Sequence, residues 1–463
     1  MTIKSTRRDF MKKAAVAGVV GSSILSGKAY CGKSKKLRHA VVGTGRRGAK
    51  DLKFFTSHPD FEVVALCDVD QEYLKKAAKR FPDARVYRDW RVMLEKEKNN
   101  IDSVNATVPN HMHAPISMTA MDMGKHVYCQ KPLTHSIHES RVLAEEAARR
   151  PDLVTQMGVQ SNSVGEYRTA MAMVQFGVIG KIKEIHSWDI VRYHYTGAYA
   201  GPDTNPLMRR RPDYADKIPA TLDWDLWLGV APYRPYVKDI YHTRFWRRWH
   251  DFGGGAHGDM GGHMLDVPFT ALELTQPKWL ISHRSPPYEE TFSPNNKVQY
   301  RFPGTKYTTG DIDYFWYDTG PVDAKKDWPI DQNATLPKDG SMLVGEKGYM
   351  FLPHSGKMQI LPEGDLSSSV KEFNANVGTI PGEMKDHYHT FIDACLGRNV
   401  KTTTPFEYSG NLTESILMGT VVNRFPKEKL TWDAKAMKFT NKPEANQYLR
   451  RDYRDGWHVP GLG

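Results

Sequence analysis

An aspartate and a histidine stand four residues apart in GGGAHGDMGGHMLDVPF, residues 253–269. Glycines there give way to an apolar run, which predicts a helix that begins near Gly258. Residues four apart lie on one face of a helix, so Asp259 and His263 would project together. An imidazole suits proton transfer because its pKa lies near neutral pH. The pair therefore indicates acid–base chemistry, and the alternative is an ion pair on a helix surface.

A lysine follows an apolar run in YCQKPL, residues 128–133. The run predicts a strand whose end delivers Lys131 to one edge of a sheet, and Pro132 fixes the backbone after it. Beside a positively charged ring such as a nicotinamide, the pKa of this amine would be lowered. Lys131 could then hold or exchange a proton on a substrate hydroxyl.

A glycine-rich loop, VVGTGRRGA, precedes these residues in the chain. Gly43, Gly45 and Gly48 fit the pattern GxGxxG between a predicted strand and a predicted helix, and Asp68 follows twenty residues after Gly48. The glycines permit a tight turn, a close approach to a pyrophosphate and close packing of helix on strand. The helix N-terminus would face the phosphates, and Asp68 would accept ribose hydroxyls. A 2′-phosphate would meet like charge there, so we expect NAD rather than NADP, a preference that Arg46 or Arg47 could soften.

The elements that must position these residues alternate between residues 38 and 160. Strands are expected at 39–43, 62–68, 103–108 and 125–131, and helices at 47–57, 71–81, 112–123 and 138–150. This alternation predicts βαβ units and a parallel sheet with helices on both faces. Asn110 and His113, in TVPNHMH after the third strand, are expected to face the cofactor, or else to cap the loop.

The order GTGxxG, CDVD, PNHMHAP and CQKPLTHS resembles the glucose–fructose oxidoreductase / inositol dehydrogenase (Gfo/Idh/MocA) family, and the similarity covers most of residues 38–457. That family usually has Glu-Lys-Pro where this chain has Gln130-Lys131-Pro132. The resemblance implies that His263 is the general base on a substrate hydroxyl and that Asp259 and Lys131 bind and polarise the same group. The cofactor-binding candidates are Gly43, Thr44, Gly45, Arg46, Arg47, Gly48, Asp68, Asn110, His113, Gln130 and Lys131.

The chain changes character after residue 160. Alternating runs predict strands at 181–195, 279–285, 296–302, 307–317 and 341–352, and helices follow at 383–396 and 410–423. Successive strands with grouped helices indicate an α+β domain with a large, mainly antiparallel open sheet. We therefore expect an α/β protein with a Rossmann domain at 38–160, a substrate-binding and oligomerisation domain at 161–440 and a tail at 441–463.

The first residues have the charged start, short apolar middle and small residues of a secretory signal. Arg7 and Arg8 in TRRDFMKK resemble a twin-arginine signal, which implies export to the periplasm and a cut after Ala29. Residues 1–37 contain nine Lys or Arg and one Asp, so they carry eight of the eleven net positive charges and leave +3 for the rest. The basic total thus gives no support to nucleic-acid binding. The four cysteines, widely spaced, form neither a disulfide framework nor a CxxC metal site.

Other patterns leave alternatives open. Aromatic residues near the expected site could stack on sugar rings or form core; they are Tyr193, Tyr195, Tyr199, Tyr241, Phe245, Trp246 and Trp249. The run 209–211 of three arginines could meet an acidic sugar or be a solvated loop. His111, His113, His257 and His263 also invite a metal site, but Lys131 fits hydride chemistry better, so no metal is expected.

These observations predict an exported NAD(P)-dependent oxidoreductase that acts on a hydroxyl of a sugar or sugar derivative. Free NAD is not expected outside the cytoplasm, so the cofactor would be bound tightly before export and recycled in place. The alternative is redox-assisted glycoside cleavage through a keto-sugar, as some relatives of the family perform. A sugar-binding protein without turnover is a third class. The resemblance also implies a homodimer or homotetramer.

Overall fold

The computed structural model describes residues 36–189, 209–284, 286–293, 295–318 and 336–463. The predicted leader therefore lies outside the described residues. Residues 36–463 form one compact unit that contains two sheets, so the predicted domain boundaries stay predictions. No helix among the described residues is long and apolar enough to cross a membrane.

The first sheet is parallel throughout, in the order β3-β2-β1-β4-β5-β6. Its central strands β1, β4 and β5 are almost wholly buried, as expected where helices cover both faces of a parallel sheet. The strands are β1 Leu37–Val42, β2 Phe61–Cys67, β3 Arg85–Tyr87, β4 Ser103–Ala106, β5 His126–Gln130 and β6 Thr155–Gly158. The prediction of a parallel sheet from βαβ units is confirmed.

Helices α3 and α6 of this half begin at side-chain caps. Asp70 accepts from Glu72 N at the start of α3, and Ser136 and Glu139 form a capping box at the start of α6. The helices are α2 Arg47–Phe55, α3 Gln71–Arg80, α4 Trp90–Glu97, α5 His113–Asp122 and α6 Ile137–Arg149. The sequence predicted all of these except α4, the shortest.

The second sheet has the order β13-β12-β11-β7-β10-β9-β8-β14-β15. Every neighbouring pair is antiparallel except β7 and β10, so the prediction of a mainly antiparallel sheet is confirmed. The strands are β7 Ile182–Asp189, β8 Trp279–Ser282, β9 Lys297–Phe302, β10 Thr308–Tyr317, β11 Asp339–Gly345, β12 Tyr349–Pro353, β13 Gln359–Leu361, β14 Lys429–Asp433 and β15 Lys438–Phe439.

One expected strand is in fact two. The run 341–352 forms an antiparallel hairpin of β11 and β12, and its turn lies between Gly345 and Gly348. A Cβ at Gly345 would lie 2.1 Å from the Ile179 carbonyl oxygen, so close backbone packing requires a glycine there. The alternation of apolar residues continues through both strands, which conceals the turn.

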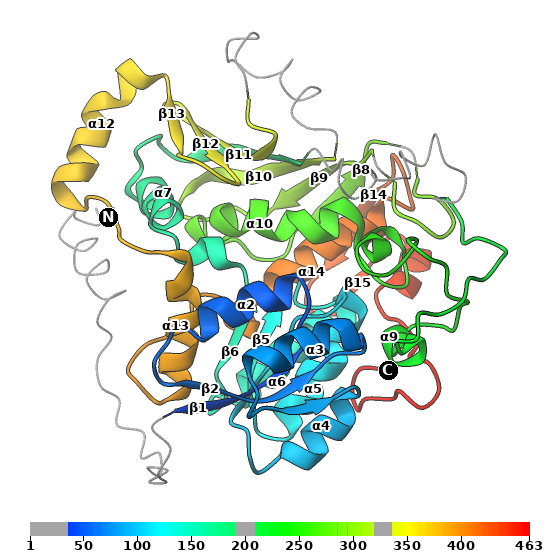
Figure 1. The fold of residues 1–463 in the computed structure, drawn as a ribbon. Helices are drawn as coiled ribbons and strands as arrows, with labels where there is room; N and C mark the ends of the chain where they lie inside the picture. Colours follow the sequence, from blue (N-terminus) through cyan, green and yellow to red (C-terminus); the bar gives the residue numbers. More distant parts are fainter. Residues whose placement is uncertain (1–35, 190–208, 285, 294, 319–335) are drawn as a thin grey trace. The chain divides into compact units, whose positions relative to one another are not determined.

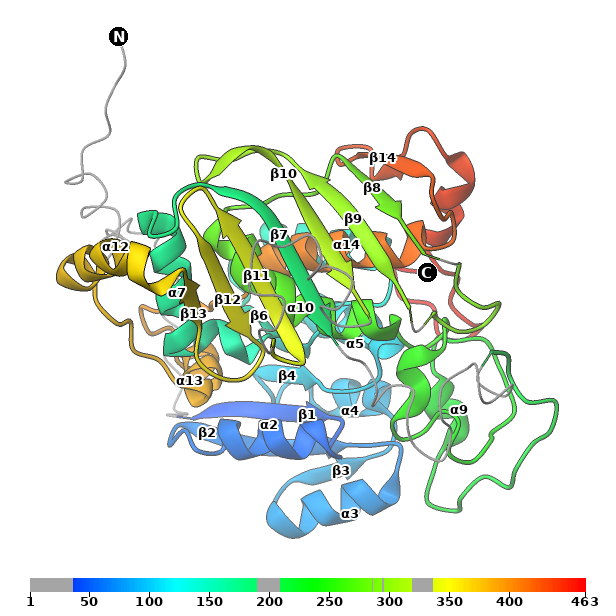
Figure 2. The same ribbon diagram turned by 90° about the horizontal axis from the view of Figure 1, so that it is seen from above.

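Helices α10 and α14 cover the face of the second sheet that is turned toward the first sheet (Figures 1 and 2). Helix α14 also packs along α6, so it joins the two halves. The helices of this half are α7 Gly165–Phe176, α9 Trp224–Leu228, α10 Gly255–Ala271, α12 Glu363–Asn376, α13 Met384–Cys395 and α14 Phe406–Val422. Helix α10 begins three residues before the predicted start and carries Asp259 and His263.

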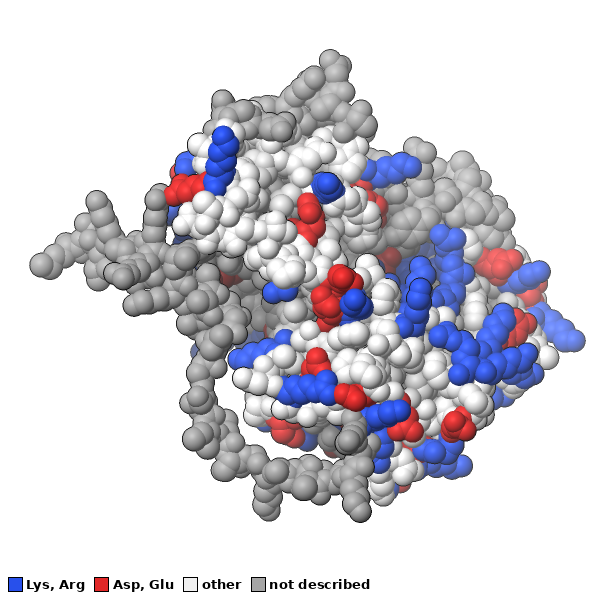
Figure 3. Space-filling model, turned by 60° about the vertical axis from the view of Figure 1, so that its left-hand side comes forward, with Lys and Arg blue, Asp and Glu red and all other residues white. Residues whose placement is uncertain are grey.

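The described surface carries charges of both signs. Figure 3 shows basic and acidic side chains together over much of one face. This mixed pattern agrees with the small net charge of +3 that the sequence leaves for residues 38–463.

Candidate active site

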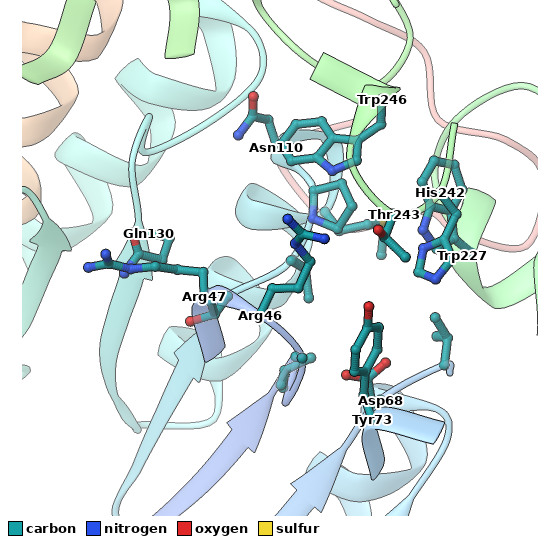
Figure 4. A pocket seen from close by; sticks show the side chains of 18 of the residues that line it. Arg46, Arg47, Asp68, Tyr73, Asn110, Gln130, Trp227, His242, Thr243 and Trp246 are labelled. Carbon is teal, nitrogen blue, oxygen red and sulfur yellow. The ribbon is translucent and has the colours of Figure 1, made fainter. Parts of the chain in front are cut away.

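A cavity of about 620 Å³ opens at the carboxyl ends of the first sheet's strands. Gly43 follows β1, Asp68 follows β2, Asn110 follows β4 and Lys131 follows β5, and all four residues line it. Ligands of open α/β sheets bind at this edge. Figure 4 shows side chains that reach the cavity from both halves of the chain, with Asp68 on one side and Trp246 on the other.

The glycine loop is packed as tightly as its sequence pattern implies. Gly43 has a φ of 88°, which favours glycine, and a Cβ at Gly48 would lie 2.0 Å from the Gly43 carbonyl oxygen. A Cβ at Gly45 would lie 2.7 Å from the ring of Tyr73. Gly45 therefore also makes room for a side chain of α3, a role that the sequence pattern does not indicate.

Asp68 ties the glycine loop to the end of β2. Its Oδ2 accepts from Thr44 N at 2.8 Å and from Thr44 Oγ1 at 3.0 Å, and its Oδ1 accepts from Asp70 N at 3.0 Å. Burial raises the pKa of this carboxyl, and the three hydrogen bonds oppose the shift. A carboxylate has about four acceptor sites, so one remains for a ribose hydroxyl. Thr44 itself is buried and does not line the cavity.

The two arginines of the loop have different surroundings. Arg46 has a φ of 40°, points into the cavity (Figure 4) and is exposed, so its guanidinium could meet a phosphate there. Arg47 lines the cavity too, but its Nε lies 3.0 Å from Asp51 Oδ1 and its Nη2 donates to the Tyr388 hydroxyl at 3.0 Å. Arg46 is thus the better phosphate ligand of the two, because Arg47 is committed to a buried acid.

A buried carboxylate, Asp51, lies behind the cavity and was not predicted. Its Oδ2 accepts from Gln130 Nε2 at 2.8 Å and from Thr107 Oγ1 at 3.0 Å, and its Oδ1 accepts from the Tyr388 hydroxyl at 2.7 Å. Burial raises the pKa of Asp51, and Arg47 opposes the shift. The only signal in the sequence is the spacing of four residues between Arg47 and Asp51 on one helix. Because its Nε2 donates to Asp51, Gln130 has a role that an ionised glutamate could not fill.

Asn110 and His113 were both expected to face the cofactor, and of the two only Asn110 lines the cavity. Asn110 lines the cavity and is 2% exposed, and its Oδ1 is buried without a hydrogen-bond partner. Such an orphaned atom fits a polar group of a bound ligand. His113 does not line the cavity: its Nδ1 lies 2.7 Å from Pro132 O and its Nε2 lies 2.9 Å from Val108 O. The ring is buried between these two carbonyl oxygens and is not part of the cavity wall.

Lys131 and Asp259 come from different halves of the chain and are in direct contact at the cavity wall. The ammonium nitrogen lies 2.9 Å from Asp259 Oδ1 and 2.7 Å from the Asp259 backbone oxygen. Arg247 Nε lies 3.2 Å from Asp259 Oδ2, so this carboxylate holds two cations. Burial lowers the pKa of Lys131, and Asp259 opposes the shift. An ammonium has three donors, and these contacts leave one for a substrate oxygen.

His263 lies one helical turn from Asp259 on α10 and lines the same cavity. Burial lowers the pKa of this imidazole well below 6.5, and the charge of Lys131 lowers it further. Its Nδ1 is buried without a hydrogen-bond partner, and its ring centroid lies 4.8 Å from that of His354. The ring is therefore neutral at neutral pH and able to accept a proton.

The aromatic and arginine clusters of the sequence divide between site and core. Trp246, Tyr241 and Trp249 belong to one buried apolar cluster, and of the three only Trp246 lines the cavity. The Arg211 guanidinium pairs with Glu290, and Arg209 lies over the Tyr288 ring. The candidates Tyr193, Tyr195 and Tyr199 lie outside the described residues.

The histidines that invited a metal site do not form one. Within the described ranges, no group of three or more His, Cys, Asp or Glu side chains could hold a metal ion. His257 instead stacks on Trp316 at 4.7 Å, and His111 Nε2 lies 3.1 Å from Trp227 O. Both rings are buried parts of the core.

This fold and cavity define a two-part oxidoreductase architecture, with a dinucleotide-binding half and an α/β half. Residues 37–157 match the family model described as "Oxidoreductase family, NAD-binding Rossmann fold", and residues 209–278 match "Oxidoreductase family, C-terminal alpha/beta domain". In these two ranges the chain matches the Gfo/Idh/MocA oxidoreductase family, and the first range matches the family's NAD-binding Rossmann fold.

Two named relatives match only parts of this chain. A levoglucosan dehydrogenase from Pseudarthrobacter phenanthrenivorans is 27% identical over 263 residues, which are 55% of this chain and 54% of the relative. A glycosyl hydrolase family 109 protein from Stenotrophomonas maltophilia is 29% identical over 194 residues, which are 39% of this chain and 41% of the relative. The chain thus spans about half or less of the length of these relatives.

Solved structures share the fold. The WlbA dehydrogenase from Bordetella pertussis, in complex with NADH and UDP-GlcNAcA, has a TM-score of 0.57 at 14% identity, over 86% of this chain and 99% of that chain. An inositol dehydrogenase homologue from Azotobacter vinelandii, complexed with NADH and myo-inositol, has a TM-score of 0.55 at 16% identity, over 86% and 98%. At these identities the likeness shows the fold alone.

Proposed function

We propose that this protein is an NAD-dependent oxidoreductase that acts on a hydroxyl group of a sugar or sugar derivative. The observation that carries the proposal is the meeting of Lys131, Asp259 and His263 in the cavity that also holds the glycine loop. The family match supports the cofactor, and the sugar dehydrogenases among the relatives support the substrate class. Asp68 favours NAD, although Arg46 leaves NADP open.

The residues fit a bound dinucleotide on three observations. The orphaned Oδ1 of Asn110 and the remaining acceptor site of Asp68 both lie on the cavity wall. The helix α2 begins at Arg47, directly after the loop, so its free N–H groups suit a pyrophosphate. When bound, NAD supplies the acceptor for the hydride that leaves the substrate carbon.

The chain's own residues then handle the proton and the charge. The free N–H of Lys131 would bind the substrate oxygen and stabilise negative charge as its O–H bond breaks. The neutral imidazole of His263 would take the proton. Asp259 keeps Lys131 in place and, with Arg247, limits its freedom to move.

We further propose that the protein is exported to the periplasm with its cofactor already bound. The twin-arginine pattern of residues 7–12 supports the export of a folded protein. Retention at nanomolar free nucleotide requires about 12 kcal/mol of binding free energy. The bound nucleotide must then be restored to its original oxidation state without leaving the protein, either by a second substrate or within one catalytic cycle. A homodimer or homotetramer is also proposed, and the mass of the native particle in solution tests it.

A carbohydrate panel tests the proposed activity directly. The protein, purified after export, is mixed with each sugar while absorbance is followed at the nicotinamide band, and a sample is denatured to release its nucleotide. We expect a nicotinamide nucleotide in the supernatant and an absorbance change with the true substrate. Active protein that contains no nucleotide would refute tight binding, and full activity of Lys131→Met would refute the assignment of the site.

The glycosyl hydrolase family 109 relatives favour one second candidate, which is redox-assisted glycoside cleavage. Oxidation of a ring hydroxyl to a ketone acidifies the neighbouring C–H bond. A base removes that proton, the glycosidic substituent leaves, water adds to the double bond, and the hydride returns to the ketone carbon. Product analysis separates the two candidates, because only this cycle yields cleaved glycoside without accumulation of a keto-sugar.

A further inference from the structure

A segment of the second half is attached to the turn that carries Asp68. Residues 221–247, here called the clasp, pair with that turn through an isolated antiparallel bridge between Asp70 and Leu222. Two backbone hydrogen bonds flank the bridge, from Gln71 N to Thr221 O at 2.9 Å and from Asp223 N to Val69 O at 3.0 Å. The clasp is thus joined by its backbone to the loop between β2 and α3.

A side-chain contact joins the other end of the clasp to the same turn. His242 Nε2 lies 3.0 Å from Asp70 Oδ2, while Asp70 Oδ1 accepts from Glu72 N and caps α3. Both side chains of the pair are mostly buried, at 16% and 12% exposure, so solvent competes weakly for this hydrogen bond. Asp70 therefore fixes the clasp and the helix start together.

The clasp forms one wall of the cavity. Figure 4 shows Trp227, His242, Thr243 and Trp246 on the side opposite Asp68 and Tyr73. The clasp residues that line the cavity are Leu226, Trp227, His242, Thr243, Arg244, Trp246 and Arg247. The ring centroid of His242 lies 6.3 Å from that of Tyr73 and 6.2 Å from that of Trp227, so aromatic surface bridges the two walls.

The clasp is also anchored by an aromatic cluster and by a contact with His111 of the first half. Trp227 is 4% exposed, and its ring stacks on Trp224 at 4.7 Å and meets Phe252 edge-on at 4.9 Å. The Trp227 carbonyl oxygen lies 3.1 Å from His111 Nε2. A packed aromatic base gives the clasp a fixed shape rather than that of a free loop.

We propose that the clasp closes over the adenosine half of the bound dinucleotide and controls its release. Asp68 marks the ribose end of the site, so the clasp residues opposite it flank the adenosine. The nucleotide leaves only when the clasp detaches from residues 68–71. This inference rests on the proposed function, because it takes the ligand to be a dinucleotide, and it gives a physical basis for retention during export.

A reversible lock tests the clasp. Asp70 and Leu222 are a non-hydrogen-bonded antiparallel pair, whose Cα atoms lie about 4.5 Å apart, within the range of a disulfide. The double variant Asp70→Cys/Leu222→Cys removes the contact with His242 and, when oxidised, replaces it with a covalent bond. The rate of exchange of bound nucleotide for labelled NAD is measured before and after reduction. We expect exchange at least about tenfold faster in the reduced form.

Controls separate the clasp from other effects. The wild-type protein, whose described cysteines Cys67, Cys129 and Cys395 are free, is expected to exchange at the same rate with and without reductant. His242→Ala is expected to accelerate exchange, and His283→Ala, at an exposed position directly after β8, is expected to leave it unchanged. The His242 variant keeps the test decisive if the double variant does not fold.

Each outcome decides a different claim. Bound nucleotide that exchanges equally fast from the oxidised and reduced forms, or from His242→Ala and wild type, overturns the clasp and leaves the proposed function intact. A protein that binds no nicotinamide nucleotide in any form overturns both. Slow exchange from the oxidised form, fast exchange from the reduced form and unchanged oxidation of the sugar support both.

Discussion

The Lys131 ammonium lies 2.9 Å from Asp259 Oδ1, although 128 residues separate the two in the sequence. Lys131 directly follows a strand of the first sheet, and Asp259 lies in the N-terminal part of a helix that covers the second sheet. The contact therefore depends on the correct docking of the two halves. It also fixes the position at which a substrate oxygen would meet a cation, because the carboxylate holds the ammonium at the cavity wall.

Replacement of Lys131 tests whether this cation acts on the substrate. In Lys131→Met the substrate oxygen loses its donor, and we expect kcat to fall by about 10²–10⁴-fold while the nucleotide stays bound. Steady-state kinetics and nucleotide content are measured on the same preparation. Lys53→Met, a matched change at an exposed position of α2, is expected to leave kcat unchanged. Equal kcat in the wild type and the Lys131 variant would show that the lysine has no role in the chemistry.

The pH dependence of kcat/KM tests the two titrating groups. Burial lowers the pKa of His263 well below 6.5, so its neutral form persists as pH falls, and the acid limb lies below pH 6.5. Burial also lowers the pKa of Lys131 from 10.5, so its ammonium is lost on an alkaline limb below that value. In His263→Asn the acid limb is expected to disappear and the alkaline limb to remain. An acid limb that survives in this variant would assign the base elsewhere.

The sequence predicted the parts of the site that depend on local geometry. Gly43, Gly45, Gly48 and Asp68 follow from a strand, a turn and a helix that are contiguous in the chain, and the spacing of four between Asp259 and His263 follows from one helix. These residues line or support the cavity as their spacing implies, with Gly48 beneath the loop.

Contacts between distant segments escaped prediction. Tyr388 reaches Asp51 across 337 residues, and the clasp has no periodic pattern from which its place over the cavity could be read. The surroundings of His113 depend on such contacts too: it is the first residue of α5, and only the folded chain shows that the carbonyl oxygens of Val108 and Pro132 enclose its ring. Polar side chains that follow the carboxyl end of a strand lie near the site on average. Tertiary packing decides whether each of them faces the cavity.

This chain has Gln130 where the family usually has glutamate, and variants of Gln130 and Asp51 test how the two side chains interact. In Gln130→Glu a second carboxylate would face Asp51 at the position of a 2.8 Å hydrogen bond, and we expect the free energy of unfolding to fall by about 3 kcal/mol. Asp51→Asn supplies a donor to the new glutamate, so the double variant is expected to recover about 1–2 kcal/mol of that loss. Chemical denaturation of the four proteins gives the coupling energy. A coupling energy of zero would mean that the two side chains act independently.

A buried histidine outside the site links stability to pH. Burial lowers the pKa of His257 to about 3, whereas an unfolded histidine has a pKa near 6.5. Between about pH 6 and pH 4 the unfolded chain binds a proton that the folded chain does not. The contribution of this residue therefore lowers the free energy of unfolding by about 1.4 kcal/mol for each unit by which the pH is lowered. The curve for His257→Gln is expected to be shallower by that slope. His283→Gln, at an exposed position, serves as the control, and identical slopes for both variants would contradict the burial of the ring.

The glycine loop offers a test of packing that is independent of catalysis. A Cβ at Gly48 would lie 2.0 Å from the Gly43 carbonyl oxygen, and backbone on both sides prevents a small side-chain adjustment from relieving the clash. Gly48→Ala is therefore expected to cost about 1–3 kcal/mol of stability and to widen the loop, which weakens nucleotide binding as well. Gly310→Ala is the matched control, because no atom lies within 4 Å of the Cβ that would be added there. Denaturation curves and nucleotide titrations of the two variants separate the effects. Normal stability and binding in Gly48→Ala would show that the close packing of α2 on β1 is not required for the site.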